Sequence, residues 1–224
     1  MKYLLSIFLL FSLSHSSDAK YNMGKSIYEQ TCISCHAEDG SAQTSMRLLV
    51  MPRALTKTIL TEEQSYQIIK KGTHYWGSAA DIMPSFESVY KENELRSVAH
   101  YITKTFKPDA QAKIDKLYAE VDSIPKDKEM KMLAVGEKAF KRTCLWCHGK
   151  TAQGNGEATR NPEMSIFPYD LTKTLLTKKQ MFLYIKYGGK YWGSAKDDMP
   201  AWSPKYDDYT IKSIIKYIEE TLKK

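Results

Sequence analysis

The sequence predicts an all-α protein made of two similar halves in tandem. The segment 55–60 returns 116 residues later, nearly unchanged, as 171–176. Near the end of each half, in 95–102 and 211–218, apolar residues recur at helical spacing. No run of alternating apolar and polar residues competes with this pattern. A long internal repeat with helical periodicity predicts two compact helical domains.

Each half carries the start and stop signals of further helices. Asn22 is placed to cap a helix that runs into the first cysteine pair. Thr61 followed by Gln64 forms a capping box, which predicts a helix that opens there and stops at Gly72. The second half repeats the box and the stop at Thr177, Gln180 and Gly188.

All four cysteines lie in two copies of one five-residue pattern, Cys-x-x-Cys-His. Two thiols at this spacing can bond both vinyl groups of one porphyrin, and the adjoining histidine then lies beneath the iron as its proximal ligand. A zinc site would need four converging ligands, and a redox dithiol has no need of the histidine. The sequence therefore predicts two covalently bound haem c groups, held by Cys32, Cys35 and His36 and by Cys144, Cys147 and His148.

The start of the chain has the pattern of an export signal. Lys2 precedes an apolar run at 3–13, and a polar stretch then ends in Ser17-Asp18-Ala19. Small residues at the first and third of these positions suit a signal peptidase, and the apolar run is short for a membrane span. We therefore predict cleavage after Ala19 and a periplasmic, exported protein. An uncleaved signal that anchors the chain is the alternative.

A charged segment separates the two halves. It holds 5 basic and 6 acidic residues, has Pro125 near its middle and contains one stretch with helical character, 110–121. Equivalent residues of the two halves lie 112 positions apart up to the haem motif and 116 positions apart further on, so the second half contains four additional residues. We place these four residues just after its haem motif, in a glycine-rich turn. The chain divides into a signal peptide (1–19), a first domain (20–108), a linker (109–131) and a second domain (132–224).

Positive charge is concentrated in the second half. The chain has 33 Lys and Arg against 26 Asp and Glu, a formal net charge of +7. Residues 20–108 hold 11 basic and 9 acidic side chains, whereas 132–224 hold 16 and 10. The cations are scattered among acids, so nucleic acid is not a predicted partner. We predict that an acidic partner docks on the second half, at Lys141, Lys150, Lys178, Lys179 and Lys190.

The sixth ligand of each iron separates an electron carrier from an enzyme. Only Met83 and Met199 occupy equivalent repeat positions, 47 and 51 residues beyond their histidines, and a proline follows each. Met51 also precedes a proline, but its counterpart is Phe167, which cannot bind iron. We therefore predict His/Met ligation of both irons through Met83 and Met199. His74, which has no histidine counterpart in the second half, is the alternative ligand of the first haem.

With these motifs each half resembles a class I cytochrome c domain, and the chain resembles the tandem di-haem members of that family. The resemblance implies that a glycine and an aromatic residue on the first helix pack against the last helix. It also implies that a proline carbonyl accepts a hydrogen bond from each proximal histidine. The residues concerned are Gly24, Tyr28 and Tyr101, Gly136, Phe140 and Tyr217, and the prolines Pro52 and Pro168.

If both irons have all six ligands, the protein is predicted to be a respiratory electron carrier rather than an enzyme. Each iron would cycle between ferrous and ferric with both axial bonds intact. One alternative is the cytochrome subunit of a dehydrogenase complex. Another is a di-haem redox enzyme such as a peroxidase, which needs an exchangeable or unusual ligand on one iron. The predicted partner is an acidic redox protein, such as a terminal oxidase or reductase, or a dehydrogenase. Membrane association is expected only through a partner or an uncleaved signal.

Overall fold

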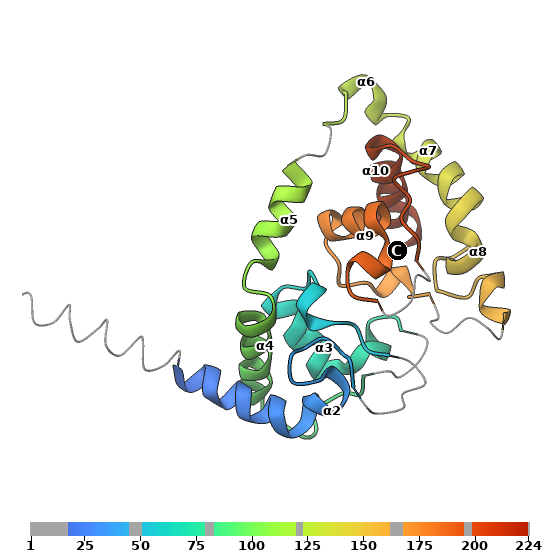
Figure 1. Ribbon diagram of the computed structural model, residues 1–224. Coiled ribbons are helices and arrows are strands. Elements are labelled where there is room, and N and C mark those ends of the chain that lie inside the picture. The colour runs from blue at the N-terminus through green and yellow to red at the C-terminus, as the bar shows by residue number, and fades with distance from the viewer. Residues whose placement is uncertain are drawn as a thin grey trace, which may run out of the picture.

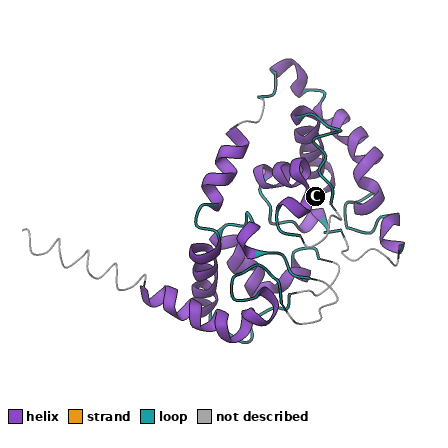
Figure 2. Cartoon of the chain, in the orientation of Figure 1, coloured by secondary structure: helices purple, strands orange, loops and turns teal. Residues whose placement is uncertain are grey.

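The computed structural model describes residues 18–44, 51–78, 83–119, 123–161, 168–194 and 199–223. All regular elements in these ranges are helical, which confirms the predicted all-α class (Figure 2). Figure 1 shows the two halves joined along one edge by α5 (Ala110–Ala119) and α6 (Lys126–Glu129). Among the described residues no helix is both long and apolar enough to cross a bilayer. The predicted signal peptide lies outside the described residues except for its last two.

The two halves repeat one order of elements. The first has a helix over 18–27, η1 (Tyr28–Cys32), α2 (Ile33–His36), η2 (Leu55–Lys57), α3 (Glu62–Tyr75) and α4 (Glu92–Phe106). The second has α7 (Met132–Ala139), η3 (Phe140–Cys144), α8 (Leu145–His148), η4 (Glu157–Arg160), η5 (Leu171–Lys173), α9 (Lys178–Tyr191), α10 (Asp208–Tyr217) and η6 (Ile218–Leu222).

The predicted cap at Asn22 is wrong. The first helix already includes Asp18, and Tyr21 inside it packs on Tyr101 of α4.

The turn that follows each haem motif has the same length in both halves. Ala37, Gly40 and Ala42 have φ of 60°, 69° and 61°, and the residues 112 positions later have φ of 78°, 60° and 74°. The turns close alike, through backbone bonds from Ala42 to the His36 carbonyl and from Gly154 to the His148 carbonyl. The four additional residues therefore enter after Gly154, in the segment that contains η4, and not just after the motif as predicted.

The first and last helices of each half cross at a glycine. A Cβ on Gly24 would lie 2.0 Å from the Ser97 carbonyl oxygen, and one on Gly136 would lie 1.9 Å from that of Ser213. No side chain fits at such distances, so glycine sets the approach of these backbones. The aromatic contacts implied by the resemblance are confirmed beside the crossings: Tyr28 with Tyr101 at 5.3 Å between ring centroids and Phe140 with Tyr217 at 5.7 Å.

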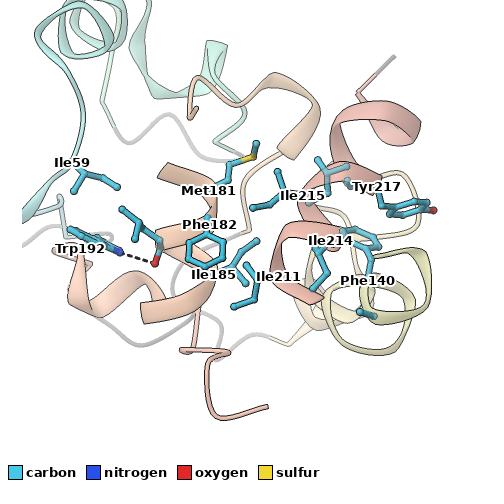
Figure 3. Packing of buried hydrophobic residues seen from close by; sticks show 14 of the residues in the cluster. Ile59, Phe140, Met181, Phe182, Ile185, Trp192, Ile211, Ile214, Ile215 and Tyr217 are labelled. Atoms are coloured by element: carbon cyan, nitrogen blue, oxygen red, sulfur yellow. Dashed lines mark hydrogen bonds between the residues drawn. The ribbon is translucent and has the colours of Figure 1, made fainter. Parts of the chain in front are cut away.

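The core of the second half extends into the first half and the linker. Ile59 and Ile114 are fully buried in the same cluster as Phe182 and Trp192. Figure 3 shows Ile59 facing the ring of Trp192. Tyr118 of α5 meets the ring of Phe182 edge-on at 5.5 Å. The linker thus contains the predicted helix, and that helix packs on α9.

A pair of glutamine side chains joins the halves across a pseudo-twofold axis. Gln64 and Gln180 each donate from Nε2 to the other's Oε1 at 2.8 Å. The second Nε2 proton of each goes to a backbone carbonyl of the other half, Leu175 and Ile59 respectively, both at 2.7 Å. Each Oε1 also accepts from the N-cap amide of its own capping box. All donors and acceptors of both amides are therefore satisfied.

Backbone bonds continue this pairing symmetrically. The Ala54 amide donates to the Gly193 carbonyl at 3.0 Å, and the Asp170 amide donates to the Gly77 carbonyl at 2.8 Å. Residues 54 and 170 are equivalent in the repeat, as are 77 and 193. The two halves therefore contact each other through the same surface, as two subunits of a symmetric dimer would.

Gln180→Leu should destabilise the folded chain. The substitution leaves the Ile59 carbonyl without its donor and one Nε2 proton of Gln64 without an acceptor in a buried contact, and each such group costs about 1–3 kcal/mol. We expect a loss of at least about 2 kcal/mol in urea denaturation followed by circular dichroism. Gln67→Leu, which removes an exposed bond to Glu63, is the control and should stay within about 0.5 kcal/mol of wild type. Equal effects of both variants would contradict the role of the pair.

Lys107 is buried behind this contact. It follows α4 and is 5% exposed, and its Nζ donates to the Leu60 carbonyl and, at 2.9 Å, to Ser65 Oγ. Burial lowers the pKa of Lys107 to about 7, against a smaller opposing effect of Glu62. Its repeat counterpart, Lys223, is more exposed and pairs with a glutamate on its own helix.

The buried amine predicts a stability that rises with pH. Between the folded pKa of about 7 and the ordinary 10.5, the unfolded chain binds a proton that the folded chain does not. Folding therefore becomes more favourable as the pH rises through this window. We expect wild type to gain urea resistance relative to Lys107→Met between pH about 7 and about 10. Lys223→Met should show no such trend. A wild-type advantage over Lys107→Met that does not change with pH would refute the assignment.

Candidate haem sites

Each Cys-x-x-Cys-His motif lies where a π-helical turn passes into a short α-helix. Cys32 ends η1, and Cys35 and His36 lie in α2, so the two thiols share one helix face. The second motif repeats this placement on η3 and α8. None of the four cysteines forms a disulfide, and burial raises the pKa of Cys32 and Cys144 to about 12. The first cysteine of each motif thus faces the protein interior, where an apolar macrocycle would attach.

His148 is oriented by a backbone carbonyl. Its Nδ1 lies 3.1 Å from the Tyr169 carbonyl oxygen, which leaves Nε2 as the ring nitrogen for iron. Burial lowers the pKa of His148, which favours the neutral imidazole that a metal needs. The implied acceptor, Pro168, is wrong by one residue. The Pro168 carbonyl faces Gly154 instead, where a Cβ would lie 2.2 Å from its oxygen.

His36 is held less tightly than its counterpart. Burial lowers its pKa also, and the Arg53 carbonyl opposes this effect. The contact falls short of hydrogen-bond geometry, so Nδ1 is buried without a partner. The carbonyl that acts on the His36 pKa is again that of the residue after the proline, and not that of Pro52. A neutral imidazole shielded from water beside two cysteine thiols is the donor set of haem c, and both halves supply it.

Met83 and Met199 occupy equivalent places in the structure. Each precedes a chain segment that docks on the kink in α3 or α9. At the kinks Gly72 and Gly188 have φ of 76° and 78°, and a Cβ on either would lie 2.8 Å from the methionine carbonyl oxygen. The residue after each glycine donates its amide to that carbonyl, at 3.0 and 2.7 Å. Both methionines pack against the core of their own half. Their bonds to iron stay a prediction.

The other candidate side chains have partners away from the motifs. His74 is exposed, and its Nδ1 contacts the Ser78 carbonyl at 3.1 Å. Met51 is partly buried and its predicted counterpart, Phe167, lies outside the described residues. No group of three His, Cys, Asp or Glu side chains in the described ranges could hold a metal ion, so zinc finds no support there.

Sequence reasoning missed the residues that surround the proximal histidines at the contact between the halves. Arg53 donates from a guanidinium nitrogen to the Tyr184 hydroxyl at 3.2 Å and lies 6.0 Å from the Tyr169 ring centroid. One feature of the sequence could have pointed to Arg53. Arg53 and Tyr169 are equivalent in the 116-residue repeat, so one half has a cation where the other has an aromatic ring.

An all-α fold with one partly buried Cys-x-x-Cys-His motif in each of two equivalent halves defines a c-type cytochrome. The family model described as "Cytochrome C oxidase, cbb3-type, subunit III" matches the chain twice, over 19–102 and 131–218. The chain therefore belongs to this family and carries its domain in tandem, with two covalently bound haem c groups.

A solved structure has the same fold over nearly the whole chain. It is a chain of the reducing HAO-like protein complex of Kuenenia stuttgartiensis, with a TM-score of 0.50 and 20% identity. The match covers 90% of the present chain and 96% of that chain. At this identity the likeness concerns the fold alone. A search of curated proteins found no match.

Proposed function

We propose that this protein is a periplasmic electron carrier that passes electrons between respiratory redox partners through two His/Met-ligated haems. The observation that carries the proposal is the equivalence of Met83 and Met199, which follow the same kink and bond to it in the same way. Because both halves hold a methionine at the same kink through the same backbone bond, the two irons are expected to have the same coordination, with all six positions filled. An enzyme would need one of them open.

The chain's own residues prepare each site for electron transfer without ligand exchange. When bound, haem supplies a one-electron ferric/ferrous couple. The motif thiols fix the macrocycle to η1–α2 or η3–α8. The Tyr169 carbonyl holds the imidazole of His148 in one tautomer, and burial keeps it neutral. The backbone bond to the Met199 carbonyl fixes the loop that would bring sulfur to the iron. Such rigidity favours a small reorganisation on reduction.

The proposed domain limits are 20–108 and 132–224, with a linker at 109–131. The helix boundaries support them, because α4 ends at Phe106 and α7 begins at Met132. Export with cleavage after Ala19 is also part of the proposal, since haem of this type is attached outside the cytoplasm. Cleavage there would keep Lys20, whose Nζ pairs with Glu62 at 2.9 Å, in the mature first helix.

A second candidate is the cytochrome subunit of a larger oxidoreductase. The family description names a subunit of an oxidase, and the solved neighbour belongs to a protein complex. Native purification from periplasmic and membrane fractions separates the two candidates. A free carrier elutes at the mass of one chain, whereas a subunit co-elutes with a catalytic partner in fixed ratio.

Both irons should show methionine ligation. The oxidised protein should have the weak near-infrared Fe–S(Met) absorption band at an intensity for two haems. Met83→Ala and Met199→Ala should each remove about half of it, because each variant opens one iron. Met51→Ala is the matched control, a methionine that also precedes a proline, and should leave the band intact. Binding of cyanide or CO to the unaltered protein, or a band for one haem only, would contradict the carrier assignment for that iron.

The structure divides the predicted docking lysines between two places. Lys178 and Lys179 open α9 beside the linker, where Lys179 approaches Asp115 of α5 at 3.4 Å. Lys141 pairs with Glu137 at 2.6 Å. Trp146 lies between the cysteines of the second motif and is 61% exposed, and Arg142 and Lys150 lie four residues to either side of it in the sequence. Lys205 reaches the same motif, where its Nζ donates to Thr143 Oγ1 at 3.3 Å. This motif face consists of Arg142, Trp146, Lys150 and Lys205.

The corresponding positions of the first half carry no cation. They are Gln30, Ser34, Glu38 and Val89. The described residues provide no ion pair for the three cations of the motif face, which leaves their charge available to an acidic partner. We propose that the acidic redox partner docks there, because a cationic surface around an exposed aromatic ring steers and then holds such a protein.

Charge reversal on the motif face should slow electron transfer to the partner. We expect Arg142→Glu with Lys150→Glu to lower the second-order rate at low salt and to flatten its salt dependence, because steering fades with screening. Lys104→Glu, on the exposed side of α4, changes the charge of the first half and should have little effect. Haem spectra should not change. An unaltered rate in the double variant, or an equal loss in the control, would place docking elsewhere.

A further inference from the structure

One cation crosses from the first half into the second. Arg53 follows Pro52 in the first half, but its side chain lies among side chains of the second. The guanidinium carbon is 5.2 Å from the Tyr184 ring centroid, and Nη1 donates to the Tyr184 hydroxyl at 3.2 Å. Tyr169 lies on the same group at 6.0 Å. Arg53 is only partly exposed, so much of its charge is removed from water.

Arg53 has no carboxylate partner among the described residues. Two other partly buried cations have one: Lys186 pairs with Asp208 at 2.8 Å, and Lys223 with Glu219 at 3.2 Å. Lys107 has none, but burial lowers its pKa to about 7, a route to neutrality that a guanidinium lacks. Two tyrosine rings and their hydroxyls satisfy part of a guanidinium, which has five donors. They do not neutralise its charge, and a desolvated unpaired cation is unfavourable. The geometry therefore calls for an anion that approaches from outside the polypeptide.

The guanidinium lies next to the residue that holds the second proximal histidine. The Tyr169 carbonyl accepts the hydrogen bond of His148, and the Tyr169 ring faces the guanidinium. In the first half the equivalent position is Arg53 itself. The repeat thus supplies this cation once, at the contact between the halves and on the side of the second haem.

We propose that the Arg53 guanidinium binds a propionate of the haem in the second half, and so acts as a cofactor-positioning residue supplied by the other half. Haem carries two carboxylates and is the anion that this protein binds covalently within the same domain. A planar fork of donors suits a carboxylate. The contact fixes the second haem relative to the first half and makes the two sites electrically different.

The charge of Arg53 has a definite effect on the potential of the second haem. A nearby cation favours the ferrous form, which holds one more electron, and therefore raises the potential. The potential of the first haem is raised less, since the guanidinium of Arg53 points away from the first half. The symmetric scaffold should thus contain a higher-potential haem in the second half.

Redox titration of Arg53→Met tests the proposal in the intact holoprotein. Each haem is followed separately by its hyperfine-shifted methyl resonances in nuclear magnetic resonance. We expect the second haem to lose about tenfold in its ferrous-to-ferric ratio at a given applied potential, about 59 mV for one electron. The first haem should shift less. The propionate bending bands in resonance Raman spectra should also change, a response that a merely structural role would not give.

Arg96→Met is the matched control. Arg96 also lies over a tyrosine ring, at 3.9 Å from Tyr66, but its side chain is 43% exposed and paired with Glu63 and Glu92. Its loss should leave the Raman bands unchanged and shift both potentials little. Arg53→Lys keeps the charge without the fork, so it should retain most of the potential and still alter the bands, even if Arg53→Met folds poorly. Unchanged propionate bands in both Arg53 variants, or a larger shift at the first haem, would overturn the proposal.

Discussion

The contact between the two halves is made by the same segments that hold the proximal histidines, and most of the molecule follows from this constraint. Tyr169 supplies the carbonyl for His148, and the next residue, Asp170, donates its amide across the twofold. Ten residues further on, Gln180 completes the buried amide pair. Any displacement of one half against the other must therefore move His148, the proposed proximal ligand of the second haem. The contact that attaches the halves to each other therefore also fixes the position of the proposed iron ligand.

The glutamine pair shows how a local signal acquires a second use. A capping box requires only that Gln64 or Gln180 return a hydrogen bond to its own N-cap. That geometry directs the free Nε2 protons outward from the helix start, where two equivalent helices meet head to head. Each amide then finds the other amide and a carbonyl beyond it. The sequence contained the box, but only the pairing of the halves shows why glutamine and not glutamate serves there: two carboxylates would repel.

The sequence was sufficient for whatever the repeat displays twice. It predicted the helical class, the haem motifs, the capping boxes and the packing of Gly24 and Tyr28 on the last helix. It failed where the two copies act on each other or where the backbone turns. The carbonyl acceptors lie one residue beyond Pro52 and Pro168, because the Pro168 carbonyl is directed at Gly154. Arg53 was missed because its partners, Tyr169 and Tyr184, lie more than a hundred residues away, a distance over which local patterns carry no information.

Several departures from symmetry concern the surroundings of the second haem, and together they bear on the direction in which the proposed carrier would pass electrons. Linker helix α5 covers Trp192, with Lys113 Nζ 5.1 Å from its ring, whereas Trp76 in the first half stays partly exposed. Arg53 adds a cation to the second site only, and the motif face surrounds the second haem with further positive charge. Each change stabilises the reduced second haem. In the proposed carrier, an electron that enters at the first haem would move downhill to the second and leave there: the duplicated fold would supply the relay, and its asymmetric additions the direction.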